Sequence, residues 1–270
     1  MLHRRTHLIG TLRYNPKRHS LSSLQSLEDE ISILLARIDS MFIFTDFMAG
    51  KRLIKVEFID NHITMPPAFR NIVQVRNYLQ EWQFRGYPYL PRLIAVFSGK
   101  QESSEPLSRG PPEYFDKTMM YAQEWFDRCK PLLDKEDPKS RHWLRHAILH
   151  VHGVISVLGY KRAYLGNGAG TPGLFEPECL DMVETCSQIL QNPYYKRTFA
   201  FDIGPIDGLF LVCVTCQKKE ICEEALRILK LAKGRTEMLA DAGIYAMRSE
   251  WILKMRFPTD NEDGEHAPNS

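Results

Sequence analysis

Apolar residues recur at helical spacing along most of the chain, and this pattern predicts a series of amphipathic helices. The clearest helix follows Pro138, where apolar residues repeat at intervals of three and four positions: Leu144, Ala147, Ile148, Val151, Ile155 and Leu158. The same reasoning predicts helices at residues 114–133, 177–190, 206–216, 220–232 and 237–255. We therefore expect the carboxy-terminal half of the chain to be mainly helical.

The amino-terminal part carries two more predicted helices. One begins at Ser26, a candidate helix cap, and has apolar residues at helical spacing within residues 31–42. The other follows a pair of prolines and has its apolar face within residues 69–82. Residues 53–59 alternate enough to suggest a strand, but no partner strand is evident, and a lone strand is not stable.

Three polar segments bound or interrupt this helical region. Residues 1–26 are polar and basic, so we expect a loose arm, and residues 257–270 are expected to form a disordered tail. Residues 98–112 combine turn formers with no apolar pattern, which is typical of a solvated, mobile loop. We predict an all-α fold, an irregular multi-helix domain of about eight helices over residues 27–256.

Composition places the chain among ordinary globular proteins. Its 270 residues can bury a sizeable core, with 44% apolar and 25% charged residues. The net charge of +2 gives no strong attraction to nucleic acid or anionic membranes, and no apolar run is long enough to span a bilayer. The basic start lacks the apolar core of a secretory signal, so we interpret the six cysteines as reduced thiols of a cytosolic or nuclear protein.

Paired cysteines are the first candidate for chemistry. Cys213 and Cys216 have the spacing of a zinc-chelating pair, and Cys222 follows. A structural zinc site needs four ligands, and no second close pair is present to complete it. The surrounding apolar run is typical of a buried helix, so we favour buried structural thiols.

A glycine-rich segment is the second candidate. Gly168, Gly170 and Gly173 match the bare spacing of a dinucleotide-binding loop. That loop must follow a strand, whereas here a long helix precedes it and Pro172 lies within it. We interpret residues 166–173 as a helix terminator and connector.

Histidines and basic residues of one predicted helix form the third candidate. His142, His146 and His150 stand four positions apart, so their side chains form a column that could bind a metal. No acidic residue occurs between Asp137 and Glu176 to complete such a site. The same stretch contains several basic residues, which we interpret, like the histidines, as a solvated helix face. They are Lys139, Arg141, Arg145, Lys161 and Arg162.

The stretch from Phe201 to Arg256 carries the most specific pattern of the chain. Its key positions are Phe201-Asp202-Ile203-Gly204, the turn from Ile206 to Leu209, Cys216, Ala225-Leu226 with Leu229, and Arg235 with Glu237 and Asp241. These positions resemble the closing helices of the regulatory domain in fungal binuclear zinc-cluster transcription factors. The chain departs from that family at Cys222, Glu223 and Glu224, where basic residues are usual, and at Met238 and Ala240, where glycine and tryptophan are favoured. A weaker likeness extends back to about Leu27 through residues 36–40 and 69–76.

The resemblance implies a helical regulatory domain of a nuclear protein, which restrains or licenses transcriptional activation. It implies action through protein partners, among which a full-length zinc-cluster factor is a candidate, or through a small-molecule effector. The family's DNA-binding module requires a dense run of cysteines, and the first hundred residues of this sequence contain none. We therefore expect no direct DNA binding by this chain, and no association with a membrane.

Motifs for hydrolysis or group transfer are missing from the sequence. There is no Gly-x-Ser-x-Gly elbow and no His-Glu-x-x-His helix. We predict that the chain is not an enzyme, and we assign no catalytic, cofactor-binding or metal-ligating residue. The alternative is a helical enzyme or small-molecule-binding protein with a pocket between helices, to which the histidine column or the cysteines contribute.

Overall fold

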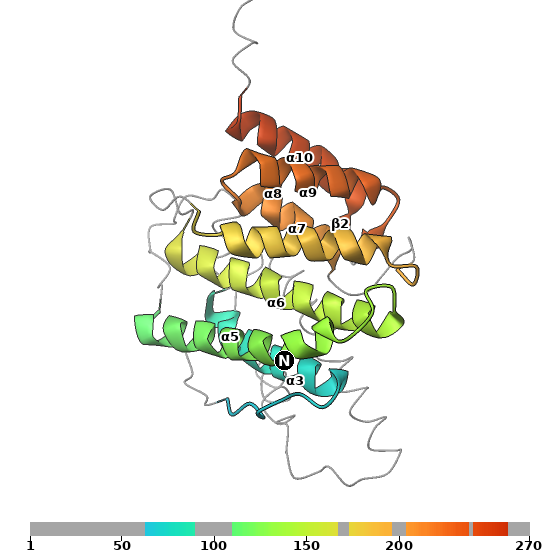
Figure 1. Ribbon diagram of the computed structural model, residues 1–270. Helices are drawn as coiled ribbons and strands as arrows, with labels where there is room; N and C mark the ends of the chain where they lie inside the picture. The colour runs from blue at the N-terminus through green and yellow to red at the C-terminus, as the bar shows by residue number, and fades with distance from the viewer. Residues whose placement is uncertain (1–62, 90–109, 167–172, 196–203, 238–239, 259–270) are drawn as a thin grey trace, which may run out of the picture. The chain divides into compact units, whose positions relative to one another are not determined.

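Helices dominate the computed structural model, which describes residues 63–89, 110–166, 173–195, 204–237 and 240–258 (Figure 1). All of these residues belong to the unit of the chain from Val56 to Ser270. Within them lie seven α-helices, one 3-10 turn and one pair of two-residue strands, so the predicted all-α class is confirmed. The predicted arm, first helix and strand, the loop up to residue 109 and the tail from residue 259 lie outside the described residues.

The first two described helices begin at residues that favour a helix start, Asn71 for one and Pro111-Pro112 for the other. Helix α3 spans Ile72–Gly86 and starts where the Asn71 side chain accepts a hydrogen bond from the Gln74 N–H at 3.0 Å. The 3-10 turn η1, Tyr87–Tyr89, follows it. Helix α5 spans Pro112–Asp134, so the predicted loop ends one residue earlier than expected, because Pro112 is preorganised for a first helical position.

Helix α6 is the long helix predicted after Pro138. It spans Arg141–Leu165 and is capped by Ser140, whose hydroxyl accepts from the Trp143 N–H at 3.0 Å. It ends at Gly166, which has φ 78°, a conformation that glycine adopts without strain. Helix α7 follows at Glu176–Gln191, close to the predicted bounds.

The final helices are α8 (Pro205–Thr215), α9 (Lys219–Leu231) and α10 (Ala242–Arg256). The first two match their predictions, but the predicted helix over residues 237–255 starts too early. Residues Thr236–Glu237 (β1) and Ala240–Asp241 (β2) instead pair as antiparallel strands, with Glu237 opposite Ala240. The helix starts later than predicted because the Glu237 carboxylate is buried against other segments. Asp241 then caps α10 by accepting a hydrogen bond from the Ile244 N–H at 2.9 Å.

Helix α6 lies between two hydrophobic cores (Figure 1). The amino-terminal core is formed by α3, η1, α5 and one face of α6, including Leu149, Val157 and Tyr160. The carboxy-terminal core is formed by α7 to α10 and the opposite face of α6, including Val151 and Leu158. Both faces of α6 are therefore buried. None of the described helices combines the length and apolar character needed to cross a membrane.

Candidate functional site

Four buried cysteines gather where α7 meets the turn between α8 and α9. Cys179 comes from α7, Cys213 from α8, Cys216 from the end of α8 and Cys222 from α9, and all are free thiols. We call these four residues the thiol cluster. The sequence correctly predicted Cys213, Cys216 and Cys222 as buried, but it gave no signal for Cys179, whose approach depends on how α7 packs against α8 and α9.

Hydrogen bonds hold the thiol cluster in place. The Cys213 thiol donates to the Cys222 carbonyl at 3.6 Å, and the Cys222 thiol lies 3.3 Å from the Cys216 carbonyl. The Cys222 thiol also lies 3.8 Å from the Val212 carbonyl. These contacts link the end of α8 to α9.

The electrostatic surroundings divide the thiols into two kinds. The neighbouring Cys179 and Cys222 thiols, the Lys218 backbone N–H and the nearby Arg256 guanidinium lower the pKa of Cys216, against the opposing effect of burial. Interaction with the Cys216 thiol and burial raise the pKa of Cys179, and the same causes raise that of Cys222.

Arg256, the last residue of α10, holds the turn that carries Cys216. Its guanidinium donates to the Cys213 carbonyl at 2.6 Å and to the Cys216 carbonyl. These carbonyls end helix α8 and have no partner further along that helix, so a cation there is favourable. The guanidinium thus fixes the backbone of Cys216 and supplies a nearby positive charge.

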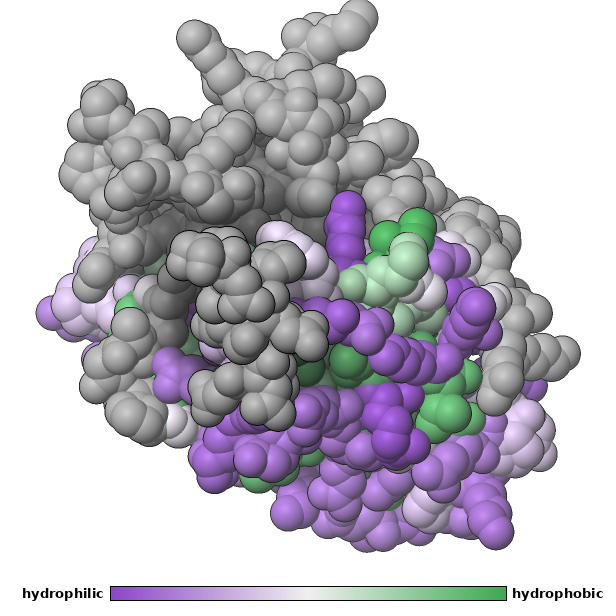
Figure 2. Space-filling model, turned by 90° about the horizontal axis from the view of Figure 1, so that it is seen from above, coloured by the Kyte–Doolittle hydropathy of each residue, from purple (hydrophilic) through white to green (hydrophobic). Residues whose placement is uncertain are grey.

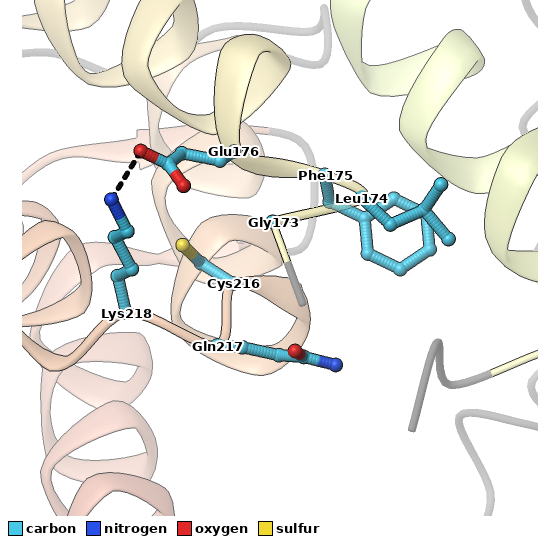
Figure 3. A pocket seen from close by; sticks show the side chains of 7 residues that line it. All are labelled: Gly173, Leu174, Phe175, Glu176, Cys216, Gln217 and Lys218. Atoms are coloured by element: carbon cyan, nitrogen blue, oxygen red, sulfur yellow. Dashed lines mark hydrogen bonds and ion pairs between the residues drawn. The ribbon is translucent and has the colours of Figure 1, made fainter. Parts of the chain in front are cut away.

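A small pocket opens beside Cys216 (Figure 3). Its lining comes from the residues that lead into α7 and from the α8–α9 turn: Gly173, Leu174, Phe175, Glu176, Cys216, Gln217 and Lys218. The Lys218 ammonium pairs with the Glu176 carboxylate at 2.5 Å, and Figure 3 shows the Cys216 sulfur pointing toward this pair. The empty volume is about 210 Å³, which includes open solvent at the mouth.

The described residues do not assemble a metal site. No group of three or more His, Cys, Asp and Glu side chains within those ranges is placed to hold a metal ion.

The predicted histidine column does not form a solvated face. His142 is exposed, but His146 is buried and its Nδ1 lies 3.1 Å from the His142 carbonyl. His150 pairs with Asp181 of α7 at 2.8 Å and packs edge-on against the Phe126 ring. The interpretation is wrong for His146 because the second face of α6 packs against α3 and α5.

The basic residues of the same stretch also divide. Lys139, Arg141 and Arg145 are exposed, as predicted. Arg162, however, is buried and donates to the Thr215 hydroxyl at 2.9 Å and to the Val214 carbonyl at 3.0 Å, while Lys161 pairs with Glu178 of α7. These two side chains tie α6 to its neighbours because α7 and α8 cover this part of the helix.

In the glycine-rich segment, Gly168 and Gly170 lie outside the described residues, and Gly173 lines the pocket beside Cys216.

Glu237 is the centre of a buried polar cluster. It is 1% exposed and accepts from the Arg235 guanidinium at 2.6 Å, from the Ile206 N–H at 2.9 Å and from the Tyr195 hydroxyl. The Arg235 guanidinium also lies over the Tyr195 ring, 3.6 Å from its centroid. Gly204 must be glycine here, since a Cβ would lie 2.6 Å from the Glu237 carboxylate. Several positions that carry the family resemblance therefore meet in one place.

The outer face of α10 is apolar and exposed. Ile244, Met247, Trp251 and Met255 recur at helical spacing and are 48%, 66%, 65% and 68% exposed. We call this set the α10 face. Figure 2 looks onto the side of the molecule that carries α10 and shows apolar patches among hydrophilic side chains.

Comparison with known proteins adds no relative, since no family model, curated protein or solved structure matches the chain.

Proposed function

We propose that the chain is a regulatory domain similar to that of fungal zinc-cluster transcription factors, and that it acts in the nucleus through a protein partner bound to the α10 face. The exposed apolar α10 face is the observation that carries this proposal. Large side chains exposed together on one helix commonly mark an interaction site. The proposal assigns no catalytic step to the chain and no direct contact with DNA.

The resemblance supports the domain type through residues that build its scaffold. Arg235 and Glu237 form the buried polar cluster, and Asp241 caps α10, so these three positions orient the helix that presents the exposed face. The departure at Ala240 falls at the first residue of β2 and leaves the buried pair and the cap intact. Met238 lies outside the described residues.

Charge indicates which kind of partner fits the α10 face. Arg248 and Lys254 are exposed and lie at its two borders, because their helical positions flank Trp251 on opposite sides. An acidic amphipathic segment could place apolar side chains on the methionines and Trp251 and carboxylates on the two basic borders. We therefore assign such a segment of a protein partner as the occupant of the α10 face.

A reporter assay tests the proposal. The chain is fused to an unrelated DNA-binding module, and reporter output is compared with that of the module alone. We expect the fusion to change the output, and we expect the double variant Met247→Glu/Trp251→Glu to abolish the change, because it places carboxylates in the apolar face. Met120→Glu is the matched control, since Met120 is 52% exposed on the distant helix α5.

Each outcome bears on the proposal. An unchanged reporter output with the wild-type fusion under all conditions would contradict the regulatory function. Equal loss in the α10 variant and in Met120→Glu would contradict the assignment of the surface. Thermal unfolding of the purified variants separates these results from a folding defect. Weaker binding of the partner to the α10 face at higher salt would support the acidic character of the partner.

A further inference from the structure

We propose that Met247 and Met255 form a paired modification site, at which hydrogen peroxide oxidises the thioether sulfurs and converts the α10 face from apolar to polar. The product is methionine sulfoxide on both sides of Trp251. The oxidation rests on the exposure and position of these side chains. Its effect on binding rests on the proposed function, in which an acidic amphipathic segment occupies the α10 face.

The first ground is the exposure of the two sulfur-bearing side chains. Met255 and Met247 are 68% and 66% exposed, more than any other large apolar side chain of the described residues. A thioether reacts when an oxidant collides with its sulfur, so the rate depends on access to the side chain. Met182, by contrast, is fully buried in the carboxy-terminal core. The fold therefore divides these methionines into reachable and protected ones.

The second ground is position on the helix. Met247, Trp251 and Met255 follow one another at intervals of four residues in α10, so a methionine lies one turn before the indole and another one turn after it. A partner that covers Trp251 must therefore approach both sulfurs. Met120 is also exposed, at 52%, but it belongs to α5 and lies outside this face.

Oxidation changes what the face can bind. A thioether is flexible and apolar and packs against varied apolar side chains, whereas a sulfoxide carries a polar oxygen. An apolar side chain that covers this oxygen removes its water without supplying a hydrogen-bond donor, which is unfavourable. The carboxylates of an acidic partner supply no donor either, because an ionised carboxylate only accepts. We therefore expect oxidation to weaken binding of the acidic segment by about tenfold or more.

The chemistry balances as a transfer of one oxygen atom. The sulfur lone pair attacks one peroxide oxygen: an S–O bond forms, the O–O bond breaks, and the proton of the transferred oxygen moves to the departing hydroxide, which leaves as water. The sulfur loses two electrons and the peroxide gains them. A methionine sulfoxide reductase supplied with a dithiol reverses the change, since the oxygen leaves as water and the dithiol becomes a disulfide.

Peroxide titration of the full chain tests the modification. Hydrogen peroxide is added in increasing amounts, and the products are located by peptide mass mapping. We expect Met247 and Met255 to gain one oxygen atom each, at a rate at least about tenfold above that of the buried Met182. Treatment with methionine sulfoxide reductases is expected to restore the original masses.

A synthetic helical peptide with a leucine face and glutamate borders tests the consequence. Its affinity is measured by isothermal titration calorimetry for the reduced chain, the oxidised chain and the oxidised chain after treatment with the reductases. Oxidation is expected to weaken binding, and reduction is expected to restore it. Met247→Leu/Met255→Leu keeps the face apolar without an oxidisable sulfur, so this variant should bind the peptide equally well after peroxide. Met120→Leu is the matched control and should lose affinity on oxidation as the wild type does.

Different outcomes judge this inference and the proposed function. Oxidation of Met182 as fast as that of Met247 and Met255 would overturn the modification site. Complete oxidation of the α10 methionines without loss of peptide affinity, or an equal loss in the leucine variant, would overturn their control of binding. A reduced chain that does not bind the peptide would contradict the proposed partner and the control of its binding, while the mass map would still decide the modification. Circular dichroism of the oxidised chain separates weaker binding from unfolding.

Discussion

At the scale of single residues, Glu237 joins three segments that are distant in sequence. Its carboxylate accepts from Arg235 beside it, from the Tyr195 hydroxyl after α7 and from the Ile206 N–H in the first turn of α8. The last contact is a helix cap supplied from outside the helix, which matters because the α8 cap residue Gly204 has no side chain. One carboxylate therefore pairs a buried cation and completes a helix end.

Replacing Glu237 with Gln is predicted to destabilise the fold strongly. The amide keeps the size of the side chain but leaves the Arg235 cation buried without its counter-charge, a change that costs about 3 kcal/mol or more. Urea unfolding followed by circular dichroism measures the loss. Glu223→Gln is the matched control, because Glu223 is exposed on α9 and its pair with Lys219 is long at 3.8 Å. Similar stability of both variants would contradict the role of Glu237.

Asp207 makes the stability of the fold depend on pH. Burial, and then the nearby Glu237 charge, raise its pKa from 3.8 to about 7. The folded state therefore binds this proton more tightly than the unfolded state, so stability is greatest below about pH 4 for this group and falls as the pH rises to about 7. Asp207→Asn is predicted to remove this slope and to stabilise the chain above neutral pH by up to about 4 kcal/mol.

Urea unfolding at about pH 5 and about pH 8 checks this prediction. Asp116→Asn, at an exposed position of α5, is expected to keep the wild-type slope. An unchanged slope in Asp207→Asn would mean that another group causes the dependence. The variant is a fair test of charge, since its amide oxygen can still accept from the Tyr245 hydroxyl, which lies 3.5 Å from Asp207 Oδ1 in the wild type.

Sequence could identify some of these residues but not their partners. Arg235, Glu237 and Asp241 stand out through the family resemblance alone. Their contacts with Tyr195 and Gly204 arise only when α7, α8 and the β1–β2 pair come together, and no local pattern encodes that meeting. Cys179 was missed for the same reason. The cysteines that raise its pKa, Cys216 and Cys222, lie on other elements, whereas spacing rules find only neighbours in sequence.

At the scale of secondary-structure elements, α10 shows how a cap sets a helix start. The apolar spacing of residues 237–255 is compatible with a longer helix, but the backbone of residues 236–241 forms the β1–β2 pair. Asp241 then accepts from the Ile244 N–H and begins the helix at Ala242. The apolar period predicts that a helix is present. Its start at Ala242 depends in addition on the buried carboxylate of Glu237, five residues earlier.

Asp241→Ala is predicted to destabilise α10 by about 1 kcal/mol through loss of its cap. Asp241→Asn keeps a capping oxygen and is expected to recover most of the loss. Urea unfolding gives the free energies, and hydrogen exchange of the first α10 amides locates the effect. Uniform loss of protection across all helices, with none specific to α10, would contradict a local capping role.

The packing of α6 between two cores explains why the prediction of a solvated face on this helix was wrong. A single apolar stripe indicates a helix that covers one core, and the sequence shows such a stripe at Leu144, Val151 and Leu158. The opposite face contains Leu149, Val157 and Tyr160 between histidines and basic residues, so its apolar content is diluted. A helix shared by two cores carries two partial stripes, and periodicity alone assigns only the stronger one.

At the scale of the whole described unit, α6 couples the two cores. The Gln83 amide donates to the Ser156 hydroxyl at 2.8 Å and the Tyr160 hydroxyl donates to the Gln83 carbonyl at 2.8 Å, which ties α3 to α6. On the other face, Arg162 ties α6 to the end of α8. Loss of either core would expose one face of α6, so neither core is expected to unfold without the other.

A cavity in either core is therefore predicted to shift one shared unfolding transition. Leu79 of α3 and Leu209 of α8 are fully buried, one in each core, and truncation to alanine should cost about 2 to 5 kcal/mol at either position. Circular dichroism reports all helices, and tryptophan fluorescence reports Trp82 and Trp125 in the amino-terminal core and Trp143 in the carboxy-terminal core. Coincident transitions in both variants are expected because α6 must keep both faces covered to remain folded. Two separate transitions, with only the mutated core shifted, would mean that the faces of α6 are energetically independent.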